Sequence, residues 1–354
     1  MLKLLINLFV FLVVPFAQAN QNQLDKFQVH SGIHLDIVEA QDLKARVFGY
    51  EIAVDLEDKI HPKVNLFFKA AAILEKGSNE VVAGLSEFAP TESLNLESGG
   101  VEYRPFSQLT LRAGALNQSE LNSPLLVGSS AFTAFEQTLK FGLFYLRAQQ
   151  AIPNNNRLSE KIGETLDSGT PYFGTETIGF NFKSKNSLLK VEFSQFTYKD
   201  LSSEIAEKSN LIGNSVIGSG VGTEFQYGFK GTNAVFEAKR HFSWFQISFL
   251  GQYLYNDKAP DKRNKGQLAQ ITLGSKKHSF LLESFRNESD SAPAFYNSKY
   301  YGHNNYTGSA FGYEMRLESL VLSLKYYDLN LIEESSTQEN TDIFNFNLAK
   351  TYNF

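Results

Sequence analysis

The dominant pattern along this chain is an alternation of apolar and polar side chains with a period of two. It is clearest over residues 342–354, where the even positions from Phe344 onward are aromatic or aliphatic except for Lys350. The odd positions are mostly amides and hydroxyls. Because successive side chains leave opposite faces of a strand, this period predicts a β-strand. Its apolar face is mostly aromatic rings and is densest at the terminus, which is typical of strands that cross a lipid interface.

The same alternation recurs along the rest of the chain. Strands with one apolar and one polar face are predicted at 27–38, 48–56, 64–74, 109–113, 225–230, 245–253 and 311–317. Tight hairpin turns are predicted at 59–63, 104–108, 139–142, 183–187, 239–243, 275–279 and 316–319. The predicted outer connections are a short one at 39–42 and longer polar ones at 75–90, 116–128, 153–170, 200–222, 257–265, 287–308 and 333–341. The alternation changes phase at 99–100 and 231–233, where a glycine-marked β-bulge is expected.

Short turns at one end and long loops at the other are the arrangement of transmembrane β-barrels. About seven tight turns and about eight outer connections give about 16 strands, within a range of about 14 to 18, with both termini on the short-turn side. We therefore predict an all-β fold, a closed antiparallel transmembrane β-barrel. The barrel must be closed, because the N–H and C=O groups of an open strand edge would find no hydrogen-bond partner in the hydrocarbon core of a membrane. The alternative is an exported soluble β-protein, which the terminal strand and the two classes of loop length disfavour.

The first nineteen residues have the layout of a secretory signal peptide. Lys3 precedes an apolar run at 4–16, and Ala17 and Ala19 supply the small residues of a cleavage site. An uncleaved membrane anchor would need roughly 20 apolar residues without a helix-ending proline. We expect residues 1–19 to be removed and 20–354 to form a single exported barrel domain with long outer loops.

Composition narrows the remaining classes of protein. Residues beyond the signal contain no apolar stretch long enough for a membrane helix. The mean hydropathy of -0.24 would suit a soluble protein, but barrel strands are half polar and give a weak hydropathy signal. The 31 Phe and 16 Tyr are a heavy aromatic load. A net charge of -5 without a basic stripe argues against nucleic acid as a partner, and the absence of Cys excludes disulfides.

The end of the chain resembles the C-terminal signature of bacterial outer-membrane β-barrels, and the architecture is similar to that of general porins. The matching residues are Phe354, Tyr352, Leu348 and Phe346. In that family the terminal strand is recognised by the barrel-assembly machinery, so the resemblance implies that machinery as a partner, together with outer-membrane lipid and lipopolysaccharide. Lys350 departs from the pattern, because its position should face lipid and an ammonium there is costly unless it reaches the interface. A homotrimer and a monomer both remain open.

The polar faces of the predicted strands carry nearly balanced acids and bases. A barrel of about 16 strands encloses an aqueous bore unless something plugs it. We predict that the bore is lined by Glu51, Lys69, Glu102, Arg112, Arg147, Lys230, Glu314 and Arg316. Porins narrow their bore with a long third outer loop. Here the third outer loop, 116–128, is short and the fifth, 200–222, is the longest, which puts the usual constriction in doubt.

No catalytic motif accompanies these strands. His30 and His34 share one strand face with Asp36, but four residues along a strand span roughly 13 Å, too far for both to bind one ion. Neither a nucleophile elbow nor a phosphate-binding glycine loop is present. The sequence predicts no enzyme, cofactor or metal. The function that the sequence favours is passive diffusion of ions and small hydrophilic solutes through the barrel. The alternative is a non-conducting barrel that serves as an adhesin or structural protein.

Overall fold

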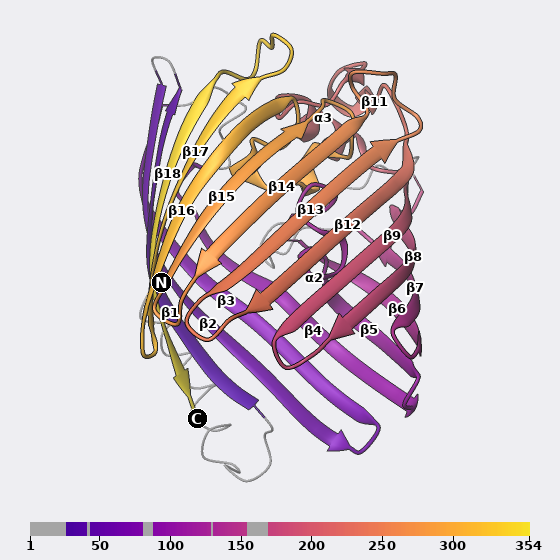
Figure 1. Ribbon diagram of the computed structural model, residues 1–354. Coiled ribbons are helices and arrows are strands. Elements are labelled where there is room, and N and C mark those ends of the chain that lie inside the picture. Colours follow the sequence, from indigo (N-terminus) through magenta and orange to yellow (C-terminus); the bar gives the residue numbers. More distant parts are fainter. Residues whose placement is uncertain (1–25, 41–42, 81–87, 129, 154–168) are drawn as a thin grey trace.

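The computed structural model describes residues 26–40, 43–80, 88–128, 130–153 and 169–354. Within these residues, sixteen antiparallel strands close into one barrel (Figure 1). The barrel strands are β1 (Lys26–Ala40), β2 (Leu43–His61), β3 (Val64–Asn79), β4 (Glu92–Phe106), β5 (Leu109–Asn117), β6 (Ala131–Phe141), β7 (Phe144–Ile152), β8 (Tyr172–Lys183), β9 (Ser187–Lys199), β12 (Phe229–His241), β13 (Gln246–Asn256), β14 (Lys265–Gly274), β15 (His278–Asn287), β16 (Tyr306–Leu317), β17 (Leu320–Leu331) and β18 (Thr341–Asn353). The predicted fold class and the strand number are confirmed.

Barrel strands pair with their neighbours in sequence. β9 pairs with β12, because β10 (Val216–Ile217) and β11 (Glu224–Phe225) form a separate two-stranded sheet. β1 pairs with β18 from Gln28–Asn353 to Glu39–Asp342, which closes the ring. Each backbone group of the barrel wall can thus be satisfied by a neighbouring strand, as a lipid environment requires.

The two ends of the barrel differ as the sequence predicts. All seven predicted tight turns join consecutive barrel strands, and the C-terminus lies at their end of the barrel (Figure 1). The opposite end carries the longer connections. These contain α2 (Ser119–Asn122), α3 (Ser203–Leu211) and the 3-10 helices η2 (Gly220–Gly222), η3 (Ala294–Tyr296) and η4 (Lys299–Tyr301). The signal peptide, and parts of the connections at 39–42, 75–90 and 153–170, lie outside the described residues.

The outer face of the barrel is apolar and exposed. Phe135, Phe193 and Phe311 are 42%, 52% and 49% exposed in mid-strand. Leaving such an area in water would forgo about 25 cal/mol per Å² of apolar surface, so a surface of this extent indicates contact with lipid. No helix in the described part of the chain is both long enough and apolar enough to cross a membrane.

Lys350, the residue that departs from the terminal pattern, lies near the short-turn end of β18. It is paired in register with Leu320, the first residue of β17. Its ammonium lies 4.8 Å from the centre of the Tyr352 ring, a cation–π geometry. A lysine so near the end of a strand can extend to the interface, and this explains how it is tolerated on the outer face.

Two predictions about strand phase are wrong, and a third holds only with a shift in position. The register of β12 with both neighbours is continuous, so there is no bulge at 231–233. Phe229 is buried inside the barrel, so Lys230 falls on the outer face with Phe236, and the prediction that Lys230 lines the bore is wrong. The physical reason is that the bore is apolar near its outer end, where an aromatic residue can face inward. The bulge expected at 99–100 occurs at Glu97 of β4.

Candidate functional site in the bore

The third outer connection folds into the bore. We call residues 118–128, which include α2, the inward loop. Leu125 is fully buried, and its N–H donates to Gln252 Oε1 on β13 at 3.1 Å. The carbonyl of Asn122 accepts a hydrogen bond from Asn233 Nδ2 on β12 at 2.9 Å. The short length of this loop made a constriction doubtful, but the structure shows that it narrows the bore. The signal that sequence reasoning missed is the apolar run at 125–127, which suits an interior and not a solvated loop.

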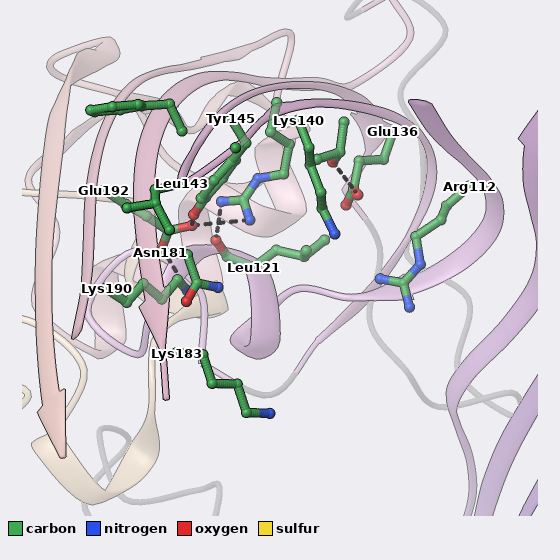
Figure 2. Close-up of a pocket in the computed structure, with 14 residues that line it drawn as sticks. Arg112, Leu121, Glu136, Lys140, Leu143, Tyr145, Asn181, Lys183, Lys190 and Glu192 are labelled. Carbon is green, nitrogen blue, oxygen red and sulfur yellow. Dashed lines mark hydrogen bonds and ion pairs between the residues drawn. The ribbon is translucent and has the colours of Figure 1, made fainter. Parts of the chain in front are cut away.

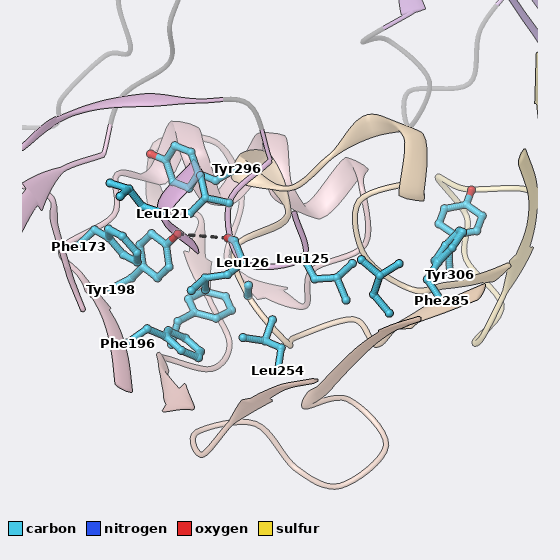
Figure 3. Close-up of a cluster of buried hydrophobic side chains, with 14 of the residues drawn as sticks. Leu121, Leu125, Leu126, Phe173, Phe196, Tyr198, Leu254, Phe285, Tyr296 and Tyr306 are labelled. Carbon is cyan, nitrogen blue, oxygen red and sulfur yellow. Dashed lines mark hydrogen bonds between the residues drawn. The ribbon is translucent and has the colours of Figure 1, made fainter. Parts of the chain in front are cut away.

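A second connection crosses the bore above the inward loop. We call residues 288–305, which include η3 and η4, the crossing segment. The ring of Tyr296 stacks at 6.0 Å on Tyr198 of β9, while the ring of Tyr300 stacks at 5.4 Å on Tyr327 of β17. The Lys299 ammonium lies 3.5 Å from an Asp36 carboxylate oxygen on β1. The segment therefore reaches opposite walls of the barrel, and the interior cluster that includes Tyr198, Tyr296 and the leucines of the inward loop is shown in Figure 3.

An asparagine holds the crossing segment in its folded form. Asn304 is fully buried. Its Oδ1 accepts hydrogen bonds from Asn287 Nδ2 at 2.7 Å and Asn297 Nδ2 at 2.5 Å. Its Nδ2 donates to the carbonyls of Ser289 at 2.8 Å and Ala292 at 2.7 Å. Both donors and both acceptor positions of the amide are used, so one side chain ties the two ends of the segment together.

The fifth connection packs on the crossing segment through α3 and the residues that follow it, up to Ser215. In α3, Ile205 and Ala206 are buried, whereas Val221 beyond the helix is 89% exposed. The N–H of Ser215 donates to Asp290 Oδ1 at 2.9 Å, and the Ser215 hydroxyl donates to Oδ2 at 2.8 Å. Burial raises the pKa of the Asp290 carboxyl, and these two hydrogen bonds oppose that rise. The loop thus neither stands free of the barrel nor fills it.

A cavity of about 410 Å³ lies between the inward loop and the short-turn end of the barrel (Figure 2). Leu121 of the inward loop and Leu143 of the β6–β7 turn both line it. Its basic lining residues are Arg112, Lys140, Arg147, Lys183 and Lys190, and its acidic ones are Glu136 and Glu192. Basic side chains therefore outnumber acidic ones around this part of the bore.

Ion pairs fix the acidic side of the cavity. Arg147 lies 3.2 Å from Glu192 Oε1 and donates to the carbonyl of Leu121 at 2.6 Å. Lys190 lies 2.8 Å from Glu192 Oε2, and the Tyr145 hydroxyl donates to Oε1 of the same carboxylate. Arg147 thereby joins the barrel wall to the inward loop. Lys140 and Lys183 are exposed at the short-turn end of the cavity, so their charges act on whatever enters it.

The sequence matches no protein-family model and no curated protein. The structure, however, aligns with OprB of Pseudomonas putida at a TM-score of 0.61, with 11% identity and 97% of each chain covered. The fold is porin-like. OccK5 (OpdH) of Pseudomonas aeruginosa aligns at 0.51, with 10% identity and 93% of this chain and 98% of that chain covered. A loop L8 deletion mutant of OmpT, an outer membrane protein of Vibrio cholerae, aligns at 0.50, with 8% identity and 92% and 99% covered. At these identities the likeness concerns the fold.

The porin-like barrel places seven of the eight residues predicted to line the bore on its inner face. Five of them besides Arg147 lie in ion pairs: Arg112 lies 3.2 Å from Glu102, and Lys69 is paired with Glu97. At the short-turn end, Arg316 lies 2.6 Å from Glu314. Glu51 and Arg147 also face inward, on β2 and β7. Of this set, Arg112 and Arg147 line the cavity. Alternation predicted that both project into the lumen, but not that they share one cavity.

His30 and His34 make separate contacts. His30 Nδ1 lies 3.0 Å from the Thr351 hydroxyl, and His34 Nε2 lies 3.0 Å from Glu75 Oε1. Among the described residues, no group of three or more His, Asp or Glu could hold a metal ion. The side chains that sequence reasoning singled out as a possible cluster are thus tied to different partners.

Proposed function

We propose that this protein is an outer-membrane channel for passive diffusion of ions and small hydrophilic solutes. The observation that carries the proposal is a charged cavity of about 410 Å³ inside a closed barrel, on the short-turn side of an inward-folded loop. The OmpT mutant to which it is similar is described as an outer membrane protein, which supports the location. We assign no catalytic step, and Glu192 of the cavity wall is engaged by Arg147, Lys190 and Tyr145.

A second candidate function is a non-conducting barrel that acts as an adhesin or structural protein. It is favoured by the crossing segment, which contacts opposite walls at the outer mouth. Single-channel recording in planar bilayers separates the two functions. Discrete conductance steps of the purified protein support the channel, and insertion without measurable current would leave the second candidate in its place.

Ion selectivity tests which charges act on the permeating solute. Arg147 is a poor target, since a change there would leave Glu192 without its buried cation and would release the inward loop. We expect Lys140→Gln/Lys183→Gln to lower the chloride-to-potassium permeability ratio about two- to fivefold, because a unit charge at ~4 Å in water is worth about 1 kcal/mol. The measurement is the reversal potential in a salt gradient near 0.1 M, and the effect should shrink near 1 M salt.

The matched control for this pair is Lys258→Gln/Lys262→Gln. Both control lysines are exposed on the connection between β13 and β14, at the opposite end of the barrel. The net charge of the protein changes equally in the two variants. If the control shifts the reversal potential as far as the test pair, the selectivity arises from overall charge and the assignment of the cavity as the solute path is lost.

The predicted signal peptide leads to a separate prediction, about where the mature chain begins. The mature protein should begin at Asn20, because the small side chains of Ala17 and Ala19 fit the signal peptidase. Intact mass and N-terminal sequencing of protein isolated from membranes check this. Recovery of chains that begin at Met1 would show that the first nineteen residues are retained.

A further inference from the structure

Three neighbouring tight turns form a strongly basic patch at the short-turn end. They are residues 183–187, 239–245 and 274–279, and together we call them the basic rim. The rim contains six Lys and Arg residues and two His but no Asp or Glu: Lys183, Lys185, Lys239, Arg240, His241, Lys276, Lys277 and His278. The turns are adjacent because β9 pairs with β12 and β13 with β14, and the N–H of His241 donates to the carbonyl of Asn186 at 2.8 Å. In a chain of net charge -5, this is a marked local excess of positive charge.

Part of this charge faces away from the bore. Arg240 is paired in register with Ile247, whose side chain is 39% exposed on the outer face. The guanidinium of Arg240 lies 6.0 Å from the centre of the Phe242 ring and donates to the Ser187 hydroxyl at 2.5 Å. It is therefore held against the outside of the barrel, at the boundary between the apolar wall and the turns.

Exposed aromatic rings accompany these cations. Trp244, the single tryptophan of the chain, is 77% exposed, and Phe242 is 47% exposed. On the neighbouring hairpin, His278 Nδ1 lies 2.8 Å from the Tyr313 hydroxyl. Aromatic rings with neighbouring Lys and Arg are the residues that settle at the level of lipid headgroups. A soluble polyanion would account for the lysines, but it would not account for the outward Arg240 or the uncovered Trp244.

We propose that the basic rim binds anionic phospholipid headgroups of the leaflet on the short-turn side of the membrane. The headgroup phosphate would pair with Arg240 and with the lysines at the turn tips, Lys185, Lys276 and Lys277, and not with Lys183, which lines the cavity. The acyl chains would lie against the apolar wall above them. This inference concerns the lipid contact and not the bore, so it stands whether or not the barrel conducts.

Trp244 itself provides the measurement. The full-length mature protein is reconstituted in bilayers that contain either brominated phosphatidylglycerol or brominated phosphatidylcholine at equal mole fraction, and tryptophan fluorescence is recorded. Bromine quenches the indole on contact, so the ratio of the two quenching curves gives the relative affinity for the anionic lipid. We expect stronger quenching by phosphatidylglycerol, weakened by salt. Arg240→Gln/Lys277→Gln should lower that preference about tenfold, given the attraction of basic side chains to an anionic surface.

The matched control is Lys59→Gln/Lys63→Gln, in the β2–β3 turn at the same end of the barrel, where Glu57 and Asp58 offset the charge. It should leave the preference unchanged, and circular dichroism verifies that each variant is folded. Equal quenching by the two lipids in the unmodified protein would overturn the proposal, as would an equal loss in the control. Quenching by neither lipid would place the rim outside the headgroup region and would point to a soluble polyanion.

Discussion

Replacing Phe354 with asparagine should abolish barrel assembly in cells while leaving the purified chain able to fold in vitro. In the structure the Phe354 ring lies 5.2 Å from the Phe27 ring and is otherwise 73% exposed. Such a ring contact is worth about 0.5–1.5 kcal/mol. The closing pair of strands, β1 and β18, is aligned over twelve residue pairs, so the loss of one terminal contact cannot open the barrel. A failure of assembly would therefore come from lost recognition of the terminal strand and not from lost stability.

Two measurements separate recognition from stability. Heat-modifiable barrel in isolated membranes reports assembly in cells, and refolding from urea into detergent micelles reports intrinsic folding. Phe106→Asn is the matched control, because Phe106 is also an aromatic at the short-turn end and is 54% exposed. It should assemble in cells. If the Phe354 variant reaches normal levels of folded barrel in membranes, the terminal signature has been misinterpreted.

The barrel could be predicted from the sequence because its two governing constraints are local. A period of two fixes which side chains face lipid, and short turns fix which strands pair. The period of two is clear in residues 342–354, and short turns such as 183–187 can be recognised from their sequence. Lys230 shows where this fails: alternation over 225–230 placed Lys230 in the bore, yet its neighbour Phe229 faces an interior that is itself apolar. Alternation gives two faces, and only the environment decides which one is inside.

The side chains on the barrel wall of the site could be predicted from the sequence, but the segments that fold into the bore could not. Arg112 and Arg147 were placed in the bore by parity alone, and they meet in the cavity. The inward loop and the crossing segment were not foreseen, because nothing local specifies whether a loop folds in or out. Their docking depends on contacts distant in sequence, such as Leu125 with Gln252 and Gly128 with Tyr296. Loop length proved a poor guide to the constriction.

Asn304→Leu should release the crossing segment and raise the single-channel conductance several-fold, while the barrel itself stays folded. The substitution keeps the branching at Cγ and the number of side-chain heavy atoms but deletes all four hydrogen bonds of the amide, at a net cost of about 0.5–1.5 kcal/mol for each bond, or about 2–6 kcal/mol in total. Other polar ties remain, such as the bond from Asn287 Nδ2 to the carbonyl of His303 at 2.6 Å, but Asn304 supplies four hydrogen bonds from one buried side chain. We therefore expect the segment to leave the bore for part of the time, which would be recorded as larger current steps and noisier open states.

Hydrogen exchange of residues 288–305 should increase in the same variant, whereas exchange in strands such as β1 and β18 should not. Asn347→Leu is the matched control, since Asn347 lies on β18 with an exposed side chain and is changed in the same way. If Asn304→Leu leaves both the conductance and the exchange rates unchanged, the crossing segment does not limit the bore. The aromatic contacts of Tyr296 and Tyr300 with the walls would then be the features that hold it, and the amide would serve only the local turn.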